Sequence, residues 1–215
     1  MKRLLICLMV LSLMLLSGGT RVACETVPLE PHPDKIEVSH HLYVTSFYDS
    51  DFRDLVRWTE GLKSGDELKI TIMSGGGPVV PLIAMVNYLE ALKARGVHLT
   101  TEVAGMSMSA AAILWMMGDE RIVHPHDYVM FHGAVVLDVY GRPQSREQMG
   151  AVNAWVLDWA DHMMRQLLLD TLHDTELVNE LMAKEGNLGP DSHNMHFYIG
   201  SDIYKMGIAT KLEGR

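Results

Sequence analysis

The spacing of apolar and polar positions changes at regular intervals along the chain, which predicts alternating strands and helices. Short alternating or continuous apolar runs predict strands at 41–48, 68–73, 98–104, 121–124, 128–132 and 208–212. Apolar residues at helical spacing predict helices at about 49–62, 78–95, 107–117, 145–173, 174–184 and 201–206. Strands that alternate with helices indicate an α/β fold with a mainly parallel sheet and helical crossovers.

Residues 1–24 have the layout of a secretory signal peptide. Lys2 and Arg3 precede an apolar run, Leu4–Leu16, and small residues then interrupt it. The run is well short of the ~20 residues that a membrane-spanning helix needs. Segment 25–40 is polar and rich in proline, as a linker is, and we expect one α/β domain at 41–215. The sequence therefore predicts an exported protein, periplasmic or secreted.

The end of this leader, Val22-Ala23-Cys24, has two interpretations. It is either a cleavage site or a degenerate lipid-attachment box in which Cys24 carries the lipid. We expect membrane association only if Cys24 is lipidated or the leader is retained. The sequence has two cysteines, Cys7 and Cys24, so we expect the mature domain to use no disulfide, cysteine-bound zinc or thiol nucleophile.

Composition and charge narrow the range of functions. Hydrophobic residues make up 48% of the chain and charged residues 21%, which is enough to build a core. The net charge of −9 is unfavourable for nucleic-acid binding, which relies on clustered lysine and arginine. We therefore expect no nucleic-acid partner.

Two turns between a strand and a helix are candidates for chemistry, because sites in parallel sheets lie at the carboxyl ends of strands. The first is Ser74-Gly75-Gly76-Gly77-Pro78 and the second is segment 105–110. Glycine turns expose backbone N–H groups that can bind a phosphate or an oxyanion. Pro78 stands where a phosphate-binding loop would need lysine, so the phosphate interpretation fails. A purely structural turn stays open.

Ser109 and His132 are the candidate nucleophile and base. Ser109 starts a helix of small and apolar residues, where the helix dipole favours charge that develops near its hydroxyl. His132 ends a predicted strand and is followed by Gly133 and Ala134. A serine, a base and a donor turn are the parts of a nucleophilic hydrolase site. Alternatively, Ser107 or Ser109 only caps the helix.

Four segments in order resemble the proteolytic subunit of the Clp protease. The glycine turn matches at 74–77, Gly-Met-Ser-Met-Ser-Ala matches the nucleophile motif at 105–110, and Pro125–His132 matches the base motif. The ending at 201–208 resembles the family's last helix and strand. The resemblance covers about 41–212 and places the nucleophile at Ser109, not Ser107.

The resemblance implies a crotonase-like α/β spiral with a long handle helix at about 145–173, through which subunits stack into rings. It also implies oxyanion donors at the N–H groups of Gly77 and Ala110. The family's catalytic Asp stands two positions before a Phe. In this sequence the matching Phe is Phe197, and Met195 occupies the position of the Asp. Nearby candidates for this third role are Asp191 and, as an alternative, Asn194.

We therefore expect a serine peptidase that uses no cofactor and cleaves short or unfolded peptides without a partner ATPase, since ATP is absent outside the cell membrane. The alternative is a catalytically silent oligomeric scaffold or peptide-binding protein. A crotonase-like acyl-CoA enzyme is disfavoured, because coenzyme A is a cytosolic compound. We expect no metal site, and the histidines at 124, 126, 193 and 196 are interpreted as core or surface residues.

Overall fold

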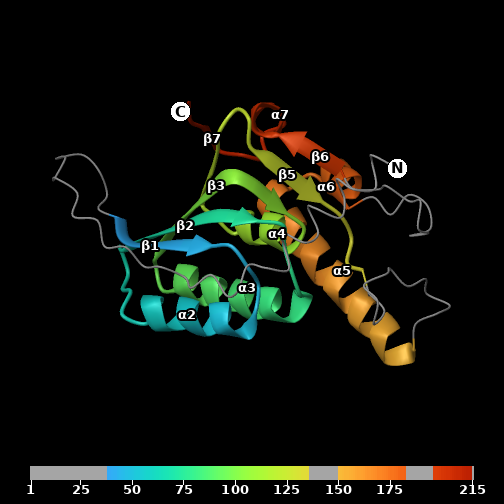
Figure 1. Ribbon diagram of the computed structural model, residues 1–215, viewed down its shortest axis with the longest axis horizontal. Helices are drawn as coiled ribbons and strands as arrows, with labels where there is room; N and C mark the ends of the chain where they lie inside the picture. The colour runs from blue at the N-terminus through green and yellow to red at the C-terminus, as the bar shows by residue number, and fades with distance from the viewer. Residues whose placement is uncertain (1–37, 136–149, 183–195, 215) are drawn as a thin grey trace, which may run out of the picture.

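The computed structural model describes residues 38–135, 150–182 and 196–214. A twisted sheet runs through the molecule, with parallel strands in the order β1-β2-β3-β4-β7 (Figure 1). Strand β5 pairs in parallel with the last part of β3, and β6 pairs with β5 in the antiparallel sense. The strands are β1 (Val38–Val44), β2 (Glu67–Ser74), β3 (His98–Met108), β4 (Glu120–Val123), β5 (Tyr128–Phe131), β6 (His196–Ile199) and β7 (Lys211–Leu212). The predicted α/β fold with a mainly parallel sheet is confirmed.

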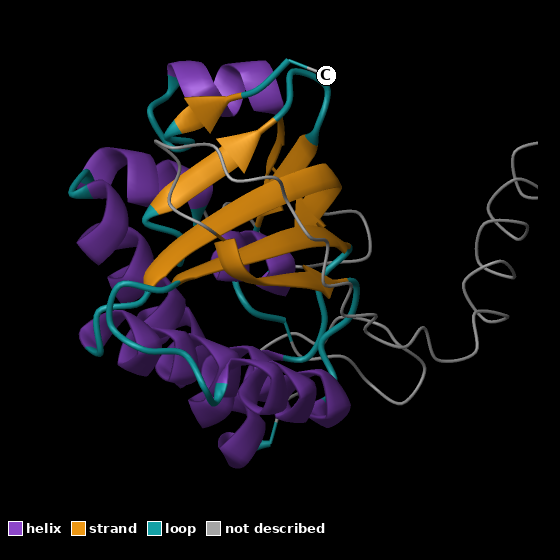
Figure 2. Cartoon of the chain, turned by 90° about the vertical axis from the view of Figure 1, so that its left-hand side faces the viewer, coloured by secondary structure: helices purple, strands orange, loops and turns teal. Residues whose placement is uncertain are grey.

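Six helices accompany the described strands: α2 (Asp49–Thr59), α3 (Val79–Ala94), α4 (Ala110–Trp115), α5 (Ala151–Leu172), α6 (Thr175–Leu181) and α7 (Gly200–Lys205). Helices α2 and α3 lie side by side along the β1–β3 part of the sheet, and α5 extends away from it (Figure 1). Figure 2 shows the molecule turned by 90°, with helices below the strands, to their left and, at the top, above them. Within the described residues, no helix is long and apolar enough to cross a membrane.

The core forms where the apolar face of the sheet meets these helices. Leu68, Ile70 and Ile72 alternate along β2 and are fully buried, as a half-covered strand requires. Every residue of α4 is buried, so this short helix is enclosed between sheet and helices. Its run of alanines allows the close approach. The core thus fixes the first turn of α4, which follows Ser109 directly.

Strand β3 is longer than predicted and changes partner along its length. Its first part pairs with β4 at Thr100–Glu102, and its last part pairs with β5 at Met106–Met108. Residues 107 and 108, predicted to start a helix, therefore belong to the strand, and that prediction was wrong. The cause is tertiary: pairing with β5 holds this segment extended.

Other boundaries differ in smaller ways. Strand β1 begins at Val38, inside the segment predicted as a linker, because it pairs there with Glu67. Strand β6 was not predicted at all, since its four residues carry no clear period. The helix predicted to begin at 174 is confirmed: Asp174 caps it, accepting a hydrogen bond from the Leu177 N–H at 2.9 Å, and α6 follows. The leader at 1–24 and the start of the predicted handle helix lie outside the described residues.

Candidate active site

Ser109 stands at the sharp junction of β3 and α4. Its backbone has φ 56° and ψ −125°, a conformation that residues other than glycine rarely adopt. Its N–H donates to the Met130 carbonyl of β5 at 2.8 Å, which holds the junction to the neighbouring strand. Strained strand-to-helix turns of this type present a nucleophilic serine at the edge of a sheet.

Ser107 lies two residues earlier and has a different environment. It is 0% exposed, and its Oγ has no hydrogen-bond partner among the described residues. Ser109 is half-buried and so retains access to solvent. Of the two serines, the structure leaves Ser109 the more accessible to a substrate.

The glycine turn after β2 packs directly against Ser109. A Cβ built on Gly76 would lie 2.8 Å from the Ser109 Cβ and 3.1 Å from the Ala110 nitrogen. Gly76 also has φ +95°, which favours glycine in its own right. The segments 74–77 and 105–110, separate in the sequence, therefore form one surface.

Two backbone N–H groups on this surface are candidate oxyanion donors. The Gly76 N–H does not serve as a candidate, because it donates to the Ser74 Oγ at 3.2 Å. The candidate donor from this turn is therefore the next N–H along the chain, that of Gly77. Ala110 is the first residue of α4, where helix geometry leaves N–H groups without an intrahelical acceptor. Such donors, close to a serine, can stabilise a tetrahedral oxyanion.

His132 follows the last residue of β5, on the strand that pairs with the end of β3. Its Nδ1 contacts the Gly133 carbonyl oxygen at 2.5 Å. A carbonyl only accepts, so Nδ1 carries the proton and the Nε2 lone pair is left as the basic site. Burial lowers the pKa of His132 and outweighs the opposite effect of the Gly133 carbonyl. The ring is therefore neutral at pH 7, as a general base must be.

The described residues show no hydrogen bond between Ser109 and His132. Their strands are nevertheless neighbours, with Met108 opposite Met130 in the parallel register. Hydrogen bonds between catalytic groups are often long in ligand-free proteins and shorten when substrate binds.

The two candidates for a third catalytic residue, Asp191 and Asn194, lie outside the described residues. Strand β6 follows them in the sequence, and its first residue, His196, pairs with Phe131. Phe131 immediately precedes His132. The chain therefore enters the described sheet next to the base.

Asp161 is a buried carboxylate near the base that the sequence reasoning missed. It lies on α5, and its Oδ1 accepts the Ala134 N–H at 2.7 Å. This bond ties the segment after His132 to the long helix. No local signal identifies such a residue, since the contact joins positions far apart in the sequence.

The histidines considered as metal ligands have other environments. His124 is buried, with Nε2 at 2.9 Å from Glu102 Oε1 and Nδ1 at 3.0 Å from the Glu213 carbonyl oxygen. His126 is exposed. His193 and the side chain of His196 lie outside the described part of the chain. Among the described residues, no group of three potential ligands is close enough to hold a metal ion.

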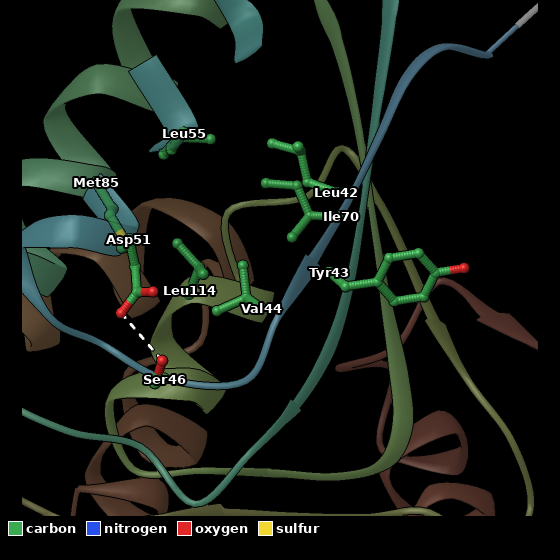
Figure 3. Close-up of a pocket in the computed structure, with 9 residues that line it drawn as sticks. All are labelled: Leu42, Tyr43, Val44, Ser46, Asp51, Leu55, Ile70, Met85 and Leu114. Carbon is green, nitrogen blue, oxygen red and sulfur yellow. Dashed lines mark hydrogen bonds between the residues drawn. The ribbon is translucent and has the colours of Figure 1, made fainter. Parts of the chain in front are cut away.

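A small pocket, which none of the candidate site residues lines, lies between β1 and helices α2 to α4 (Figure 3). Its volume of about 20 Å³ suffices for about one water molecule. The lining is mostly apolar, and the Ser46 hydroxyl donates to Asp51 at 3.1 Å beside it. The pocket is too small for a substrate.

Comparison with known proteins identifies the family of the chain. The family model described as Clp protease matches residues 52–184, which is more than half of the chain. The matched span contains Gly77, Ser109, Ala110 and His132, and it ends before Asp191. No curated protein matches the chain. The chain belongs to the Clp protease family, a family of peptidases.

Proposed function

We propose that this protein is a serine-type endopeptidase that cleaves short or unfolded peptides. The observation that carries the proposal is the strained, accessible Ser109 packed against the glycine turn at Gly76, with its N–H bonded to β5, the strand that directly precedes His132. A helix-capping serine needs none of these features. The family membership supports peptide-bond hydrolysis as the reaction.

In this mechanism His132 Nε2 takes the proton of the Ser109 hydroxyl while Oγ attacks the scissile carbonyl carbon. The carbonyl oxygen becomes an oxyanion, which the N–H groups of Gly77 and Ala110 bind. The imidazolium then gives its proton to the leaving amine as the peptide bond breaks. Water hydrolyses the acyl-enzyme by the same two proton transfers and releases the Ser109 hydroxyl.

A third residue would orient the base. We assign this role to Asp191, with Asn194 as the alternative, because each can accept the Nδ1–H bond that Gly133 accepts in this structure. Loss of an orienting carboxylate in a triad lowers kcat by about 10⁴-fold, yet leaves catalysis above the rate in water. An amide at this position is therefore compatible with slow activity.

The predicted leader determines the setting of the reaction. Export would place the enzyme where no ATP drives an unfoldase, so its substrates would be peptides that are short or already unfolded. The proposed location is the periplasm or the exterior, with membrane attachment only if Cys24 carries a lipid or the leader is retained.

Helix α5 supports a homo-oligomeric ring. Trp155 and Trp159 are 66% and 40% exposed, and their rings stack with centroids 6.2 Å apart. Two adjacent exposed tryptophans on one helix face are typical of a surface that another protein covers. We propose that a second copy of the chain covers it.

The competing function is a catalytically silent scaffold or peptide-binding protein. One observation favours it: the Nδ1 of His132 binds its own neighbour, Gly133, and no hydrogen bond or ion pair joins the ring to a carboxylate among the described residues. A coenzyme A enzyme has less support, since that chemistry has no use for a serine and histidine pair.

A fluorophosphonate probe separates the two functions. The purified protein should react with the probe at Ser109, and Ser109→Ala should abolish the labelling. Ser107→Ala is the matched control and should be labelled as the unmodified protein is. Absence of labelling at Ser109, with a control hydrolase labelled in the same tube, would favour the silent scaffold.

A further inference from the structure

On one edge of strand β3, the pairing partner changes from β4 to β5 at Gly105. Before this residue, Thr100–Glu102 pair with β4, and after it Met106–Met108 pair with β5. Gly105 has φ +94°, so the strand turns there and its ladder hydrogen bonds are interrupted. An interrupted ladder leaves backbone N–H groups that need other acceptors.

The carboxylate of Asp127 supplies one such acceptor and also binds the residue after β4. Its Oδ1 accepts the Gly105 N–H at 2.9 Å, and its Oδ2 accepts the His124 N–H at 2.8 Å. Asp127 is only 4% exposed and lies in the turn that joins β4 to β5. The Asp127 side chain therefore links β3, at the point where its partner changes, to the residue that follows β4.

The turn between β4 and β5 does not require the bond from Asp127 to Gly105. The Asp127 N–H donates to the His124 carbonyl at 3.0 Å, and the Oδ2 bond closes the same short loop. These two contacts are those of an ordinary turn stabilised by aspartate. The bond to Gly105 is different, because it joins the turn to another strand.

This bond lies just before the paired segments of β3 and β5 that lead to the two site residues. Four residues after Gly105 the chain reaches Ser109, and five residues after Asp127 it reaches His132. Between these points the register is Met106 with Tyr128 and Met108 with Met130, and it ends in the 2.8 Å bond from the Ser109 N–H to the Met130 carbonyl.

We propose that Asp127 is a positioning residue that holds the serine strand and the histidine strand in the register that brings Ser109 and His132 together. This inference rests on the proposed function, since it assumes that the two residues react as a pair. Asp127 touches neither the substrate nor the reacting atoms, and it acts through the backbone of β3 and β5.

The test compares Asp127→Asn and Asp127→Ala with a matched control. In Asp127→Asn one oxygen still accepts an N–H, but the amide NH₂ faces the other donor, so one link is lost. Asp127→Ala loses both. The control is Thr59→Val on α2, which removes a buried hydroxyl that donates to the Leu55 carbonyl at 2.7 Å, away from β3 and β5.

Two quantities are measured for each variant: the rate of fluorophosphonate labelling at Ser109, divided by the folded fraction, and the pH dependence of that rate. A displacement of about 1 Å in a catalytic group costs about 100-fold in rate, so we expect a loss of this order for Asp127→Ala and a smaller loss for Asp127→Asn. We also expect both variants to weaken the inflection that His132 gives the pH profile.

The outcomes distinguish this inference from the proposed function. If the unmodified protein is not labelled, the proposed function fails and the inference fails with it. If it is labelled, and both Asp127 variants match Thr59→Val in normalised rate and pH profile, Asp127 only stabilises the turn. Should Asp127→Ala not fold, Asp127→Asn alone decides the matter by the same comparison.

Discussion

Gly76 lies in contact with Ser109, so closely that a methyl group on the glycine would stand 2.8 Å from the Ser109 Cβ and 2.6 Å from the Met108 carbonyl oxygen. The two residues belong to different turns, and their contact builds the surface on which we place the oxyanion donors. The contact also explains why this turn needs glycine at this position.

Gly76→Ala adds only one methyl group, yet it should lower both the stability of the protein and the reactivity of Ser109. Alanine at φ +95° carries backbone strain of about 1–3 kcal/mol, and the new methyl group must push Ser109 or the turn aside. We expect a lower melting temperature and a large loss of fluorophosphonate labelling. Gly75→Ala is the matched control, because a Cβ there meets no atom within 4 Å. Equal labelling in both variants would contradict the assigned contact.

The pH dependence of activity should reflect the burial of His132. Burial lowers the pKa of this histidine, so the ring stays neutral to a pH below its ordinary value of about 6.5. Only the neutral form accepts the serine proton, and kcat/KM on a peptide should therefore be constant above this value. It should fall as the pH drops through the lowered pKa. The measurement is kcat/KM across about pH 4–9, which spans roughly the range over which histidine titrates in proteins.

An acidic limb centred above the ordinary histidine pKa would contradict this assignment. His132→Gln provides the control, since it removes the titrating group while it keeps a side chain of similar size. Its residual activity should lack the limb altogether.

Ser107→Ala should stabilise the protein or leave its stability unchanged. The hydroxyl of Ser107 is buried and has no hydrogen-bond partner among the described residues, and such a group costs about 1–3 kcal/mol. Removing it should raise the free energy of unfolding, measured by urea titration. Thr101→Val is the comparison, because that hydroxyl is equally buried but donates to the Trp115 carbonyl at 2.6 Å. A larger loss in Ser107→Ala than in Thr101→Val would show that Ser107 has a partner in the folded protein.

Replacing Trp155 and Trp159 together by alanine should dissociate the proposed oligomer. The stacked rings present apolar area that a second copy would bury, and loss of that area weakens association. Sedimentation equilibrium should show a lower mass for the double variant. Trp58→Ala on α2 is the control, since Trp58 is 39% exposed, about as much as Trp159, on a different helix. A monomeric unmodified protein would overturn the proposed assembly.

Much of the fold was predictable because it depends on short-range patterns. The strand from Leu68 and the helix that follows Asp174 have periodic or capping signals that act locally, and both were found where expected. The extension of β3 through Met108 and the existence of β6 were not predictable in this way. Both depend on pairing with β5, which is a long-range contact.

The same distinction between local patterns and long-range contacts applies to the candidate site. Ser109 and His132 stand at chain positions that motif order identifies, and the structure brings their strands together. The contacts of Gly76, Asp127 and Asp161 join distant segments, and no pattern within one segment reveals them.

The change of partner in β3 has a consequence for the folding units of the molecule. The half of the strand before Gly105 is paired along its length with β2 and, in part, with β4. The half after it keeps a single pair with β2, Ser74 with Ser107, and otherwise depends on β5, which in turn pairs with β6. Segments that share few partners open separately under native conditions. Amide hydrogen exchange should therefore be slow before Gly105 and faster after it, so that the protein can loosen its serine junction without unfolding the sheet that supports it.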